Sequence, residues 1–385
     1  MYKEFEKEGS GVNERRHSPG HPDHALNLAA IQPSEYNGKA ENAPALSFSQ
    51  LDGVSVVTSK QKNLSRIVFL ILLIAAAYPL RVQAQLHPGR NDVEFDHGGR
   101  HRTAVVLIPK SVQQPAEGWP LVMMLHGAGG SARNVIESTG WPELGERVGI
   151  VTVYPNGTPK NEKRPESFFG NQQTWNSGGK ESLAAGALSA TAKEIDDVGF
   201  LGELIARVRK EVPVDPKRIF VAGHSNGAGM AYRFAFERSD LVAAAGVVAG
   251  HFFLEPSPLS NPVSLIQIVG DKDPFTPMAG GKVTILGRTA TLPPALQSPR
   301  EWATMIGIEG DAKTIREDDS VQIRSWGPSA SGAEVRSIII KGHGHAYPSP
   351  TDRFHPAVLF GPTVKTLNAT ETMWKFFSEH ARKEP

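Results

Sequence analysis

Apolar positions fall into short runs from about residue 103 onward, and these runs predict the strands of one sheet. Polar or glycine-containing stretches separate the runs, and several runs are almost continuously apolar and rich in Val and Ile. Such runs are typical of strands that are buried on both faces of a parallel sheet. The strands expected from them are 103–110, 120–127, 149–155, 218–225, 242–250, 263–271 and 335–342.

Helical periodicity appears between those runs. In Asp196–Glu211, for example, Leu201 and Ile205 lie on one apolar stripe. The expected helices are Asp196–Glu211, Asn226–Glu237 and a C-terminal helix within 370–383. Residues 275–300 are expected to form a long loop that could carry a strand hairpin. Strand–helix alternation over this length predicts an α/β fold, with a mostly parallel central sheet and helices on both faces.

Residues 59–84 have the organisation of a secretory signal peptide. A basic flank precedes the apolar run Ile67–Leu80, whose 14 residues are few for crossing a hydrocarbon core. Pro79 interrupts a helix there, and small residues suited to signal peptidase end at Ala84. We expect cleavage after Ala84 and a secreted or periplasmic product. An uncleaved signal anchor is the alternative, and it would be the expected contact with a membrane.

Residues 1–58 are polar and show no lasting periodicity, which predicts disorder. A signal peptide that begins this far along a chain is unusual. We therefore hypothesise that 1–53 is a mis-called extension and that translation begins at Val54, Val56 or Val57. Residues 85–385 are expected to form a single catalytic domain.

Composition narrows the function classes. Hydrophobic residues make up 39% of the 385, charged residues 21%, and the net charge is +1. No dense Lys/Arg stripe appears either, which argues against a nucleic-acid partner. The chain has no Cys, which excludes disulfides, Cys-based zinc sites and thiol nucleophiles. We expect no metal and no cofactor.

The stretch Gly223-His224-Ser225-Asn226-Gly227 fits the pattern G-x-S-x-G, and it lies between a predicted strand and a predicted helix. That context is typical of a nucleophile elbow, in which the two glycines permit a sharp turn and the serine is presented at its tip. The backbone N–H of Asn226 would then stabilise an oxyanion at the helix start. The alternative is a serine that only caps the helix.

A nucleophilic serine needs a histidine base and a carboxylate, which follow it in that fold in the order acid, then base. Asp271 and Asp273 come after one predicted strand, and His343 and His345 come after the last. Carboxyl ends of parallel strands are where sites gather. We favour Asp273 because it lies further out in its loop, and the residues alone leave the choice of histidine open.

A second oxyanion donor is expected from the loop after an earlier strand. The stretch His126-Gly127-Ala128 opens a glycine-rich turn there, and the N–H of Ala128 is the candidate donor. The loop lacks the G-K-[ST] ending of a phosphate-binding loop. Because His126 precedes Ser225, it breaks the expected order for a base, and we expect it to brace the loop.

Several motifs together resemble the secreted polyhydroxybutyrate-depolymerase-like and feruloyl-esterase-like branch of the α/β-hydrolases, from about Val105 to Phe377. They are "LVMMLHGAGGSA", "TWNSGG", "EIDDVGFLGELI", "VDPKRIFVAGHSNGAGMAYRFA", "VGDKDPFTP", "GHGHAYP" and "NATETMWKFF". The resemblance implies an α/β-hydrolase fold and a catalytic triad of Ser225, Asp273 and His345. Its H-G-x-x-D-like and G-H-x-W-P-like patterns assign the last two.

The same resemblance suggests contacts to substrate. Tyr347 stands where Trp is usual, and Trp175 would help wall the site, although a buried structural Trp is the alternative. His224 is a further candidate, whose side chain could instead pack into the sheet. The chain departs from the family at Ala128 and Val269, where Cys and His are usual, and in an insertion at Lys180–Lys193. These departures cluster around the expected mouth of the site, where substrate choice is decided.

The expected function is a secreted serine esterase that works through an acyl-enzyme. Its expected partner is an ester, either a feruloyl or acetyl ester on a polysaccharide or a hydroxyalkanoate oligomer. Two alternatives stay open: a peptidase that uses the same triad on short peptides, and a catalytically inactive hydrolase fold that serves as a binding module.

Overall fold

The computed structural model describes residues 85–168, 170–178, 195–285, 288–350 and 357–383, all within the unit Val82–Pro385. The predicted signal segment, the extension before it and the insertion Lys180–Lys193 lie outside these residues. Within the described ranges, no helix is long and apolar enough to cross a membrane.

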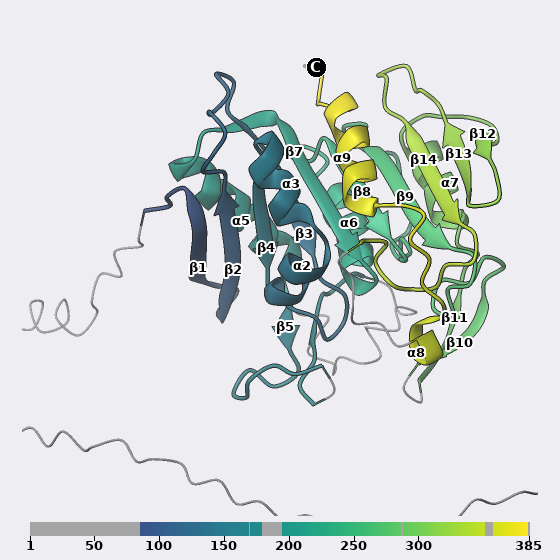
Figure 1. Ribbon diagram of the computed structural model, residues 1–385, viewed down its shortest axis with the longest axis horizontal. Helices are drawn as coiled ribbons and strands as arrows, with labels where there is room; N and C mark the ends of the chain where they lie inside the picture. Colours follow the sequence, from purple (N-terminus) through teal and green to yellow (C-terminus); the bar gives the residue numbers. More distant parts are fainter. Residues whose placement is uncertain (1–84, 169, 179–194, 286–287, 351–356, 384–385) are drawn as a thin grey trace, which may run out of the picture. The chain divides into compact units, whose positions relative to one another are not determined.

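The core of the fold is a ten-stranded sheet in the order β1-β2-β4-β3-β7-β8-β9-β14-β13-β12 (Figure 1). Every neighbouring pair from β4 to β14 is parallel, and the strands at both ends pair antiparallel. The strands are β1 Gly89–His97, β2 Arg100–Ile108, β3 Trp119–Leu125, β4 Val151–Pro155, β7 Val214–His224, β8 Ala244–Val248, β9 Ser264–Gly270, β12 Lys313–Glu317, β13 Val321–Trp326 and β14 Val335–Ile340. The expected mostly parallel α/β sheet is therefore confirmed.

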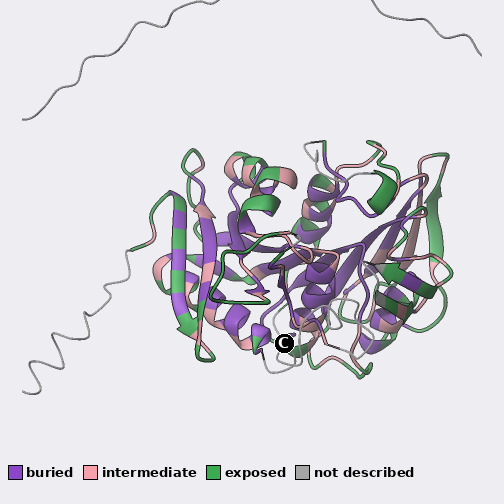
Figure 2. Cartoon of the chain, turned by 90° about the horizontal axis from the view of Figure 1, so that it is seen from below, coloured by how far each residue is buried: buried purple, intermediate pink, exposed green. Residues whose placement is uncertain are grey.

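Burial along the strands follows from their place in the sheet. Every residue of β3, β4, β8 and β9 is buried, because helices cover both faces of the parallel part. At the edges the pattern changes: buried and exposed residues alternate along β1, and β12 is exposed throughout (Figure 2). The charged side chains of β12 suit an edge that must not pair with another chain.

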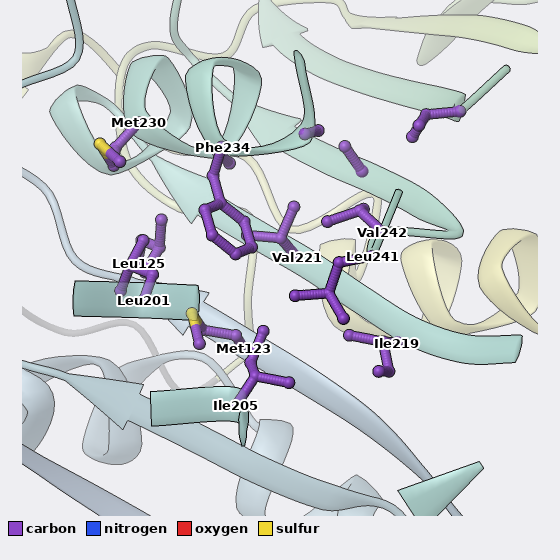
Figure 3. Packing of buried hydrophobic residues seen from close by; sticks show 14 of the residues in the cluster. Met123, Leu125, Leu201, Ile205, Ile219, Val221, Met230, Phe234, Leu241 and Val242 are labelled. Carbon is purple, nitrogen blue, oxygen red and sulfur yellow. The ribbon is translucent and has the colours of Figure 1, made fainter. Parts of the chain in front are cut away.

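Helices cover the two faces of the sheet. In β3, Leu121, Met123 and Leu125 belong to one apolar cluster, and Val122 and Met124 to the other, because successive side chains point to opposite faces. The first cluster contains residues of α5 Asp197–Glu211, α6 Asn226–Glu237 and α7 Gln297–Met305. Figure 3 labels Leu201 and Ile205 of α5 and Met230 and Phe234 of α6 in this cluster. The second contains residues of α2 Ala132–Ser138, α3 Trp141–Val148 and α9 Ala369–Glu379.

The structure agrees with the predicted strands and helices wherever the apolar pattern was strong. The helix predicted at Asn226–Glu237 is α6. The region 275–300 contains the hairpin β10 Gly281–Ile285 and β11 Arg288–Leu292, as expected, but α7 begins inside it, where a loop was predicted. The strands β1, β12 and β13, at the two ends of the sheet, were not predicted. The edge strands β1 and β12 bury one face or none, and β13 is mostly half-buried, so all three lack a continuous apolar run.

Packing between α9 and the sheet gives a first test of this architecture. The ring of Phe377 is fully buried and stacks on Phe220 of β7, with centroids 4.8 Å apart. Replacing it by Ala removes that contact and leaves a cavity, so Phe377→Ala should lower the free energy of unfolding by about 3–5 kcal/mol. Chemical denaturation measures this loss. As the control, Val358→Ala, at a side chain that is 90% exposed, should change it by less than about 0.5 kcal/mol. Equal effects would contradict the packing described.

Candidate active site

Ser225 lies at the turn between β7 and α6, in a backbone conformation that L-residues rarely adopt (φ 54°). The turn brings backbone segments too close for side chains. A Cβ on Gly223 would lie 2.1 Å from the carbonyl oxygen of Gly227, and a Cβ on Gly227 would lie 2.4 Å from that of Leu125. Glycine is therefore required at both positions, and the strain is held by the packing around it.

Three side chains from separate strand ends meet at this turn. The hydroxyl of Ser225 lies 2.9 Å from Nε2 of His345, and Nδ1 of His345 lies 2.9 Å from Oδ2 and 3.0 Å from Oδ1 of Asp273. Asp273 follows β9 and His345 follows β14. Since a carboxylate only accepts hydrogen bonds, Nδ1 of the histidine donates to it, and Nε2 is left to accept the serine proton.

Backbone amides hold the Asp273 carboxylate in place. Its Oδ1 accepts hydrogen bonds from the N–H of Phe275 at 2.7 Å and of Thr276 at 3.0 Å. Burial raises the pKa of this carboxyl, but the nearby His345 and the hydrogen bonds lower it further, so that the net shift is downward. Asp273 is therefore an ionised group in a buried place, which fixes the tautomer and orientation of the imidazole.

The alternative acid and base are engaged elsewhere. Asp271 accepts a hydrogen bond from the N–H of Gly342 at 2.6 Å and does not contact His345. The ring of His343 donates through Nε2 to the carbonyl of Ala346 at 2.9 Å and accepts at Nδ1 from the N–H of Val364 at 3.1 Å. Of the two candidate pairs, the structure brings Asp273 and His345 to the serine.

The loop of His345 is braced from two sides. Nε2 of His224 donates to the carbonyl of His345 at 2.7 Å, so the side chain of His224 points toward the base. The N–H of His345 in turn donates to the carbonyl of Phe360, at the end of α8 Ala357–Phe360, at 2.6 Å. The rings of Phe275 and Phe360 flank the imidazole, with centroids 4.8 Å and 6.3 Å from it. The sequence did not predict these two aromatic neighbours. Only Phe275 could have been found from the sequence, because it lies two residues after Asp273.

The glycine-rich loop after β3 packs directly on the turn of Ser225. A Cβ on Gly127 would lie 3.3 Å from Cβ of Ser225. The amides of the two residues after Ala128 already have acceptors: the N–H of Gly129 donates to the carbonyl of Gln173, and the N–H of Gly130 donates to the carbonyl of Gly127. Among the described residues, the N–H of Ala128 has no acceptor. As the first residue of α6, Asn226 has an N–H without an intrahelical acceptor.

His126 and Trp175 brace that loop from within the protein. The indole N–H of Trp175 donates to the carbonyl of His126 at 2.9 Å, and Nε2 of His126 accepts from the N–H of Gly157 at 2.9 Å. Burial lowers the pKa of His126 to about 4, so its ring is neutral. Trp175 is fully buried, which favours the structural alternative for this residue over a wall of the site.

The side chain of Asn226 has a role that the sequence did not predict. Its Oδ1 accepts from the N–H of Trp175 at 2.8 Å, and its Nδ2 donates to the carbonyl of Trp175 at 3.1 Å. Asn176, which follows Trp175, is held by a buried ion pair. Asp197 lies 2.7 Å from Arg102 and also accepts a hydrogen bond from the N–H of Asn176 at 2.7 Å. Asn226 therefore contributes more than its backbone to the architecture of the turn.

Tyr347 is buried next to His224. It is 2% exposed, its hydroxyl lies 2.9 Å from Oγ1 of Thr370, and burial raises its pKa. Its ring meets that of His224 edge-on at 6.0 Å. The substrate contacts expected for Tyr347, Trp175 and His224 stay predictions. In the described part of the chain, no cluster of three or more His, Asp or Glu side chains could hold a metal ion.

Protonation of buried His126 should cost stability in acid. Its pKa is about 4 in the folded protein and near 6.5 when unfolded, so the unfolded chain takes up the proton first as the pH falls. The free energy of unfolding should therefore drop by roughly 3 kcal/mol between pH 6.5 and pH 4 from this residue. Glutamine can accept from Gly157 but does not titrate, so urea titrations of His126→Gln should show a shallower fall. Parallel curves would refute the neutral brace.

Comparisons with known proteins identify related esterases. Residues 104–279 match the family model described as Esterase PHB depolymerase. NocK of Nocardia uniformis subsp. tsuyamanensis, a protein assigned as an esterase, is 26% identical over 71% of this chain and 79% of its own length. Feruloyl esterase B of Piromyces equi is 25% identical over 51% of this chain, and the bifunctional acetylxylan esterase/xylanase XynS20E of Neocallimastix patriciarum is 22% identical over 68%.

The matched region spans 42% and 33% of the length of those last two proteins, respectively. Among solved structures, an acetyl xylan esterase from Aspergillus awamori matches 66% of this chain and 94% of its own, at 16% identity and a TM-score of 0.45. The family match and the esterase relatives confirm the resemblance predicted from the motifs: the chain, with its mostly parallel α/β sheet, is a carboxylic ester hydrolase similar to the Esterase PHB depolymerase branch.

Proposed function

We propose that the protein is a secreted serine esterase in which Ser225 is the nucleophile, His345 the general base and Asp273 the orienting acid. One observation carries this proposal. Three side chains from the ends of β7, β9 and β14 form an unbroken chain of hydrogen bonds, and the serine stands on a strained turn. Capping a helix would not need either feature.

The geometry suggests the following sequence of steps. As Oγ of Ser225 attacks the ester carbonyl, Nε2 of His345 takes the hydroxyl proton, and the ionised Asp273 stabilises the imidazolium. The amides of Ala128 and Asn226 donate to the oxyanion of the tetrahedral intermediate. When the C–O bond breaks, His345 returns the proton to the leaving alcohol, and the acyl group stays on Ser225. Water, deprotonated by His345, then attacks the acyl-enzyme; as the bond between the acyl carbon and Oγ of Ser225 breaks, His345 returns the proton to Oγ and the acid is released.

We propose feruloyl or acetyl esters of polysaccharides, or hydroxyalkanoate oligomers, as the substrates. The names of the related feruloyl and acetylxylan esterases support the first class. The aromatic rings of Phe275 and Phe360 beside His345 support an apolar or aromatic acyl group. We assign residues 85–385 to one catalytic domain, and we propose secretion because 59–84 has the organisation of a signal peptide.

Removing the nucleophile should abolish the chemistry and keep the fold. Ser225→Ala should lower kcat for p-nitrophenyl acetate by roughly 10³-fold or more, because no other group can form the acyl-enzyme. Ser378→Ala, at an exposed hydroxyl on α9, serves as the matched control and should behave as the wild type. Hydrolysis assays with purified proteins measure both, followed by methyl ferulate, acetylated xylan and hydroxybutyrate oligomers. Wild-type rates for Ser225→Ala would end the proposal.

His224 should act through His345. The change His224→Phe removes the N–H that binds the carbonyl of His345, and loss of one neutral hydrogen bond should lower kcat by about tenfold. Glutamine offers an N–H at a similar reach, so His224→Gln should recover most of the rate. Steady-state kinetics and the pH profile of kcat check this pair. An equal loss in both variants would argue against a positioning role for that hydrogen bond.

A further inference from the structure

A second strained turn lies beside that of Ser225. In the described ranges, Ser225 and Ala249 are the two residues other than glycine with positive φ, at 54° and 53°. Ala249 directly follows β8, the strand that pairs in parallel with β7, and the N–H of Ser225 donates to the carbonyl of Val248 at 2.9 Å. Strain of this kind gathers where surrounding structure imposes a conformation for function. Two neighbouring strands therefore end in strained turns at the same edge of the sheet.

The turn after β8 delivers one side chain to this edge. A Cβ on Gly250 would lie 2.9 Å from the carbonyl oxygen of Ser225 and 2.6 Å from Cβ of Ala228, so the chain runs against the first turn of α6. The following residue, His251, has its carbonyl beside Gly229 of the same helix. Phe252 is then fixed in the core, because its N–H donates to Oγ of Ser298 at 3.0 Å.

His251 is buried without the partners that a buried imidazole needs. It is 2% exposed, and neither of its ring nitrogens has a hydrogen-bond partner among the described residues. A neutral imidazole carries one N–H donor and one acceptor, and leaving such groups unpaired in the protein costs roughly 1–3 kcal/mol each. The other imidazoles close to the triad, those of His126, His224 and His343, all make hydrogen bonds. The fold therefore maintains an unfavourable group at the site.

His251 directly follows Gly250, which packs on the backbone of Ser225, and its ring is neutral. Burial lowers its pKa to about 4, Asp273 acts to raise the pKa and His345 to lower it. The ring of Phe253 lies 5.9 Å away and offers no hydrogen bond. A neutral imidazole can both donate to and accept from an uncharged polar group, and a hydroxyl is the group that offers both in return.

We propose that His251 is a substrate-binding residue that recognises a hydroxyl group of the ester, on either its acyl or its alcohol part. This inference rests on the proposed esterase function and narrows it to hydroxylated esters. Three observations support it: the strained turn after β8, the close packing of Gly250 on the first turn of α6, and the two ring nitrogens of His251 that have no hydrogen-bond partner among the described residues. Sugar alcohols and hydroxyacyl groups both carry a hydroxyl near the scissile bond, and this hydroxyl is the group that His251 would recognise in either kind of ester.

Matched ester pairs test this proposal. The acyl pair is p-nitrophenyl 3-hydroxybutyrate and p-nitrophenyl butyrate, and the alcohol pair is 2-hydroxyethyl acetate and ethyl acetate. In one pair, the wild type should prefer the hydroxylated ester by about tenfold in kcat/KM, and His251→Leu should remove that preference. The pair that responds shows which part of the ester His251 binds. His251→Gln, which can still form hydrogen bonds, should keep more of the preference than His251→Leu.

Stability separates recognition from a structural role. Because His251 has no partner to lose, His251→Leu should keep or raise Tm, whereas a residue that holds the fold would lower it. Ser257→Ala, at an exposed residue further along the same loop, should leave both the preference and Tm unchanged. A lowered Tm for His251→Leu, the absence of any preference in the wild type, or a wild-type preference that survives in His251→Leu would overturn the proposal. Should Ser225→Ala hydrolyse all four esters as fast as the wild type, the esterase mechanism itself would fail instead.

Discussion

The close approach of backbone at the end of β7 is the constraint on which the site depends. Gly227 lies against the carbonyl oxygens at the end of β3, and Gly223 lies against Gly227, so β3, β7 and α6 meet with no room for side chains. This contact forces Ser225 into positive φ and brings the loop that begins at Gly127 onto the serine. A single packing arrangement thus positions both the proposed nucleophile and the candidate oxyanion donors.

Hydrogen bonds extend that constraint to loops that are distant in sequence. Asn226 clamps the backbone of Trp175, the indole of Trp175 holds the carbonyl of His126, and His126 holds Gly157. Each group in this series is buried and has its hydrogen-bond partner. Breaking any one of these bonds would therefore leave a buried polar group unpaired, which lowers the stability of the fold. These hydrogen bonds hold the loop that carries Ala128 in place, as the oxyanion role proposed for its amide requires.

Imidazole rings near the site perform different tasks because their surroundings differ. His126 is neutral through burial and acts as a brace, and His224 uses its N–H on the backbone of the base. His345 lies between a serine hydroxyl and an ionised carboxylate, which is the arrangement that a general base needs. His251 resembles His126 in its burial and low pKa, but its ring nitrogens have no hydrogen-bond partner among the described residues, and this contrast underlies the role in substrate recognition that we propose for it.

The apolar pattern determined the parallel sheet and the helices α5, α6 and α9, because strands buried on both faces give continuous apolar runs and helices packed on a sheet give one apolar stripe. The G-x-S-x-G motif identified the turn at Ser225. Sequence order and family patterns also selected Asp273 and His345. Tertiary structure alone decided what the neighbours do: the brace formed by Trp175, the second role of Asn226, the orientation of His224 and the unpaired His251. Those roles depend on contacts between segments separated by up to 121 residues, such as His224 and His345, and no local pattern records which distant carbonyl a side chain will meet.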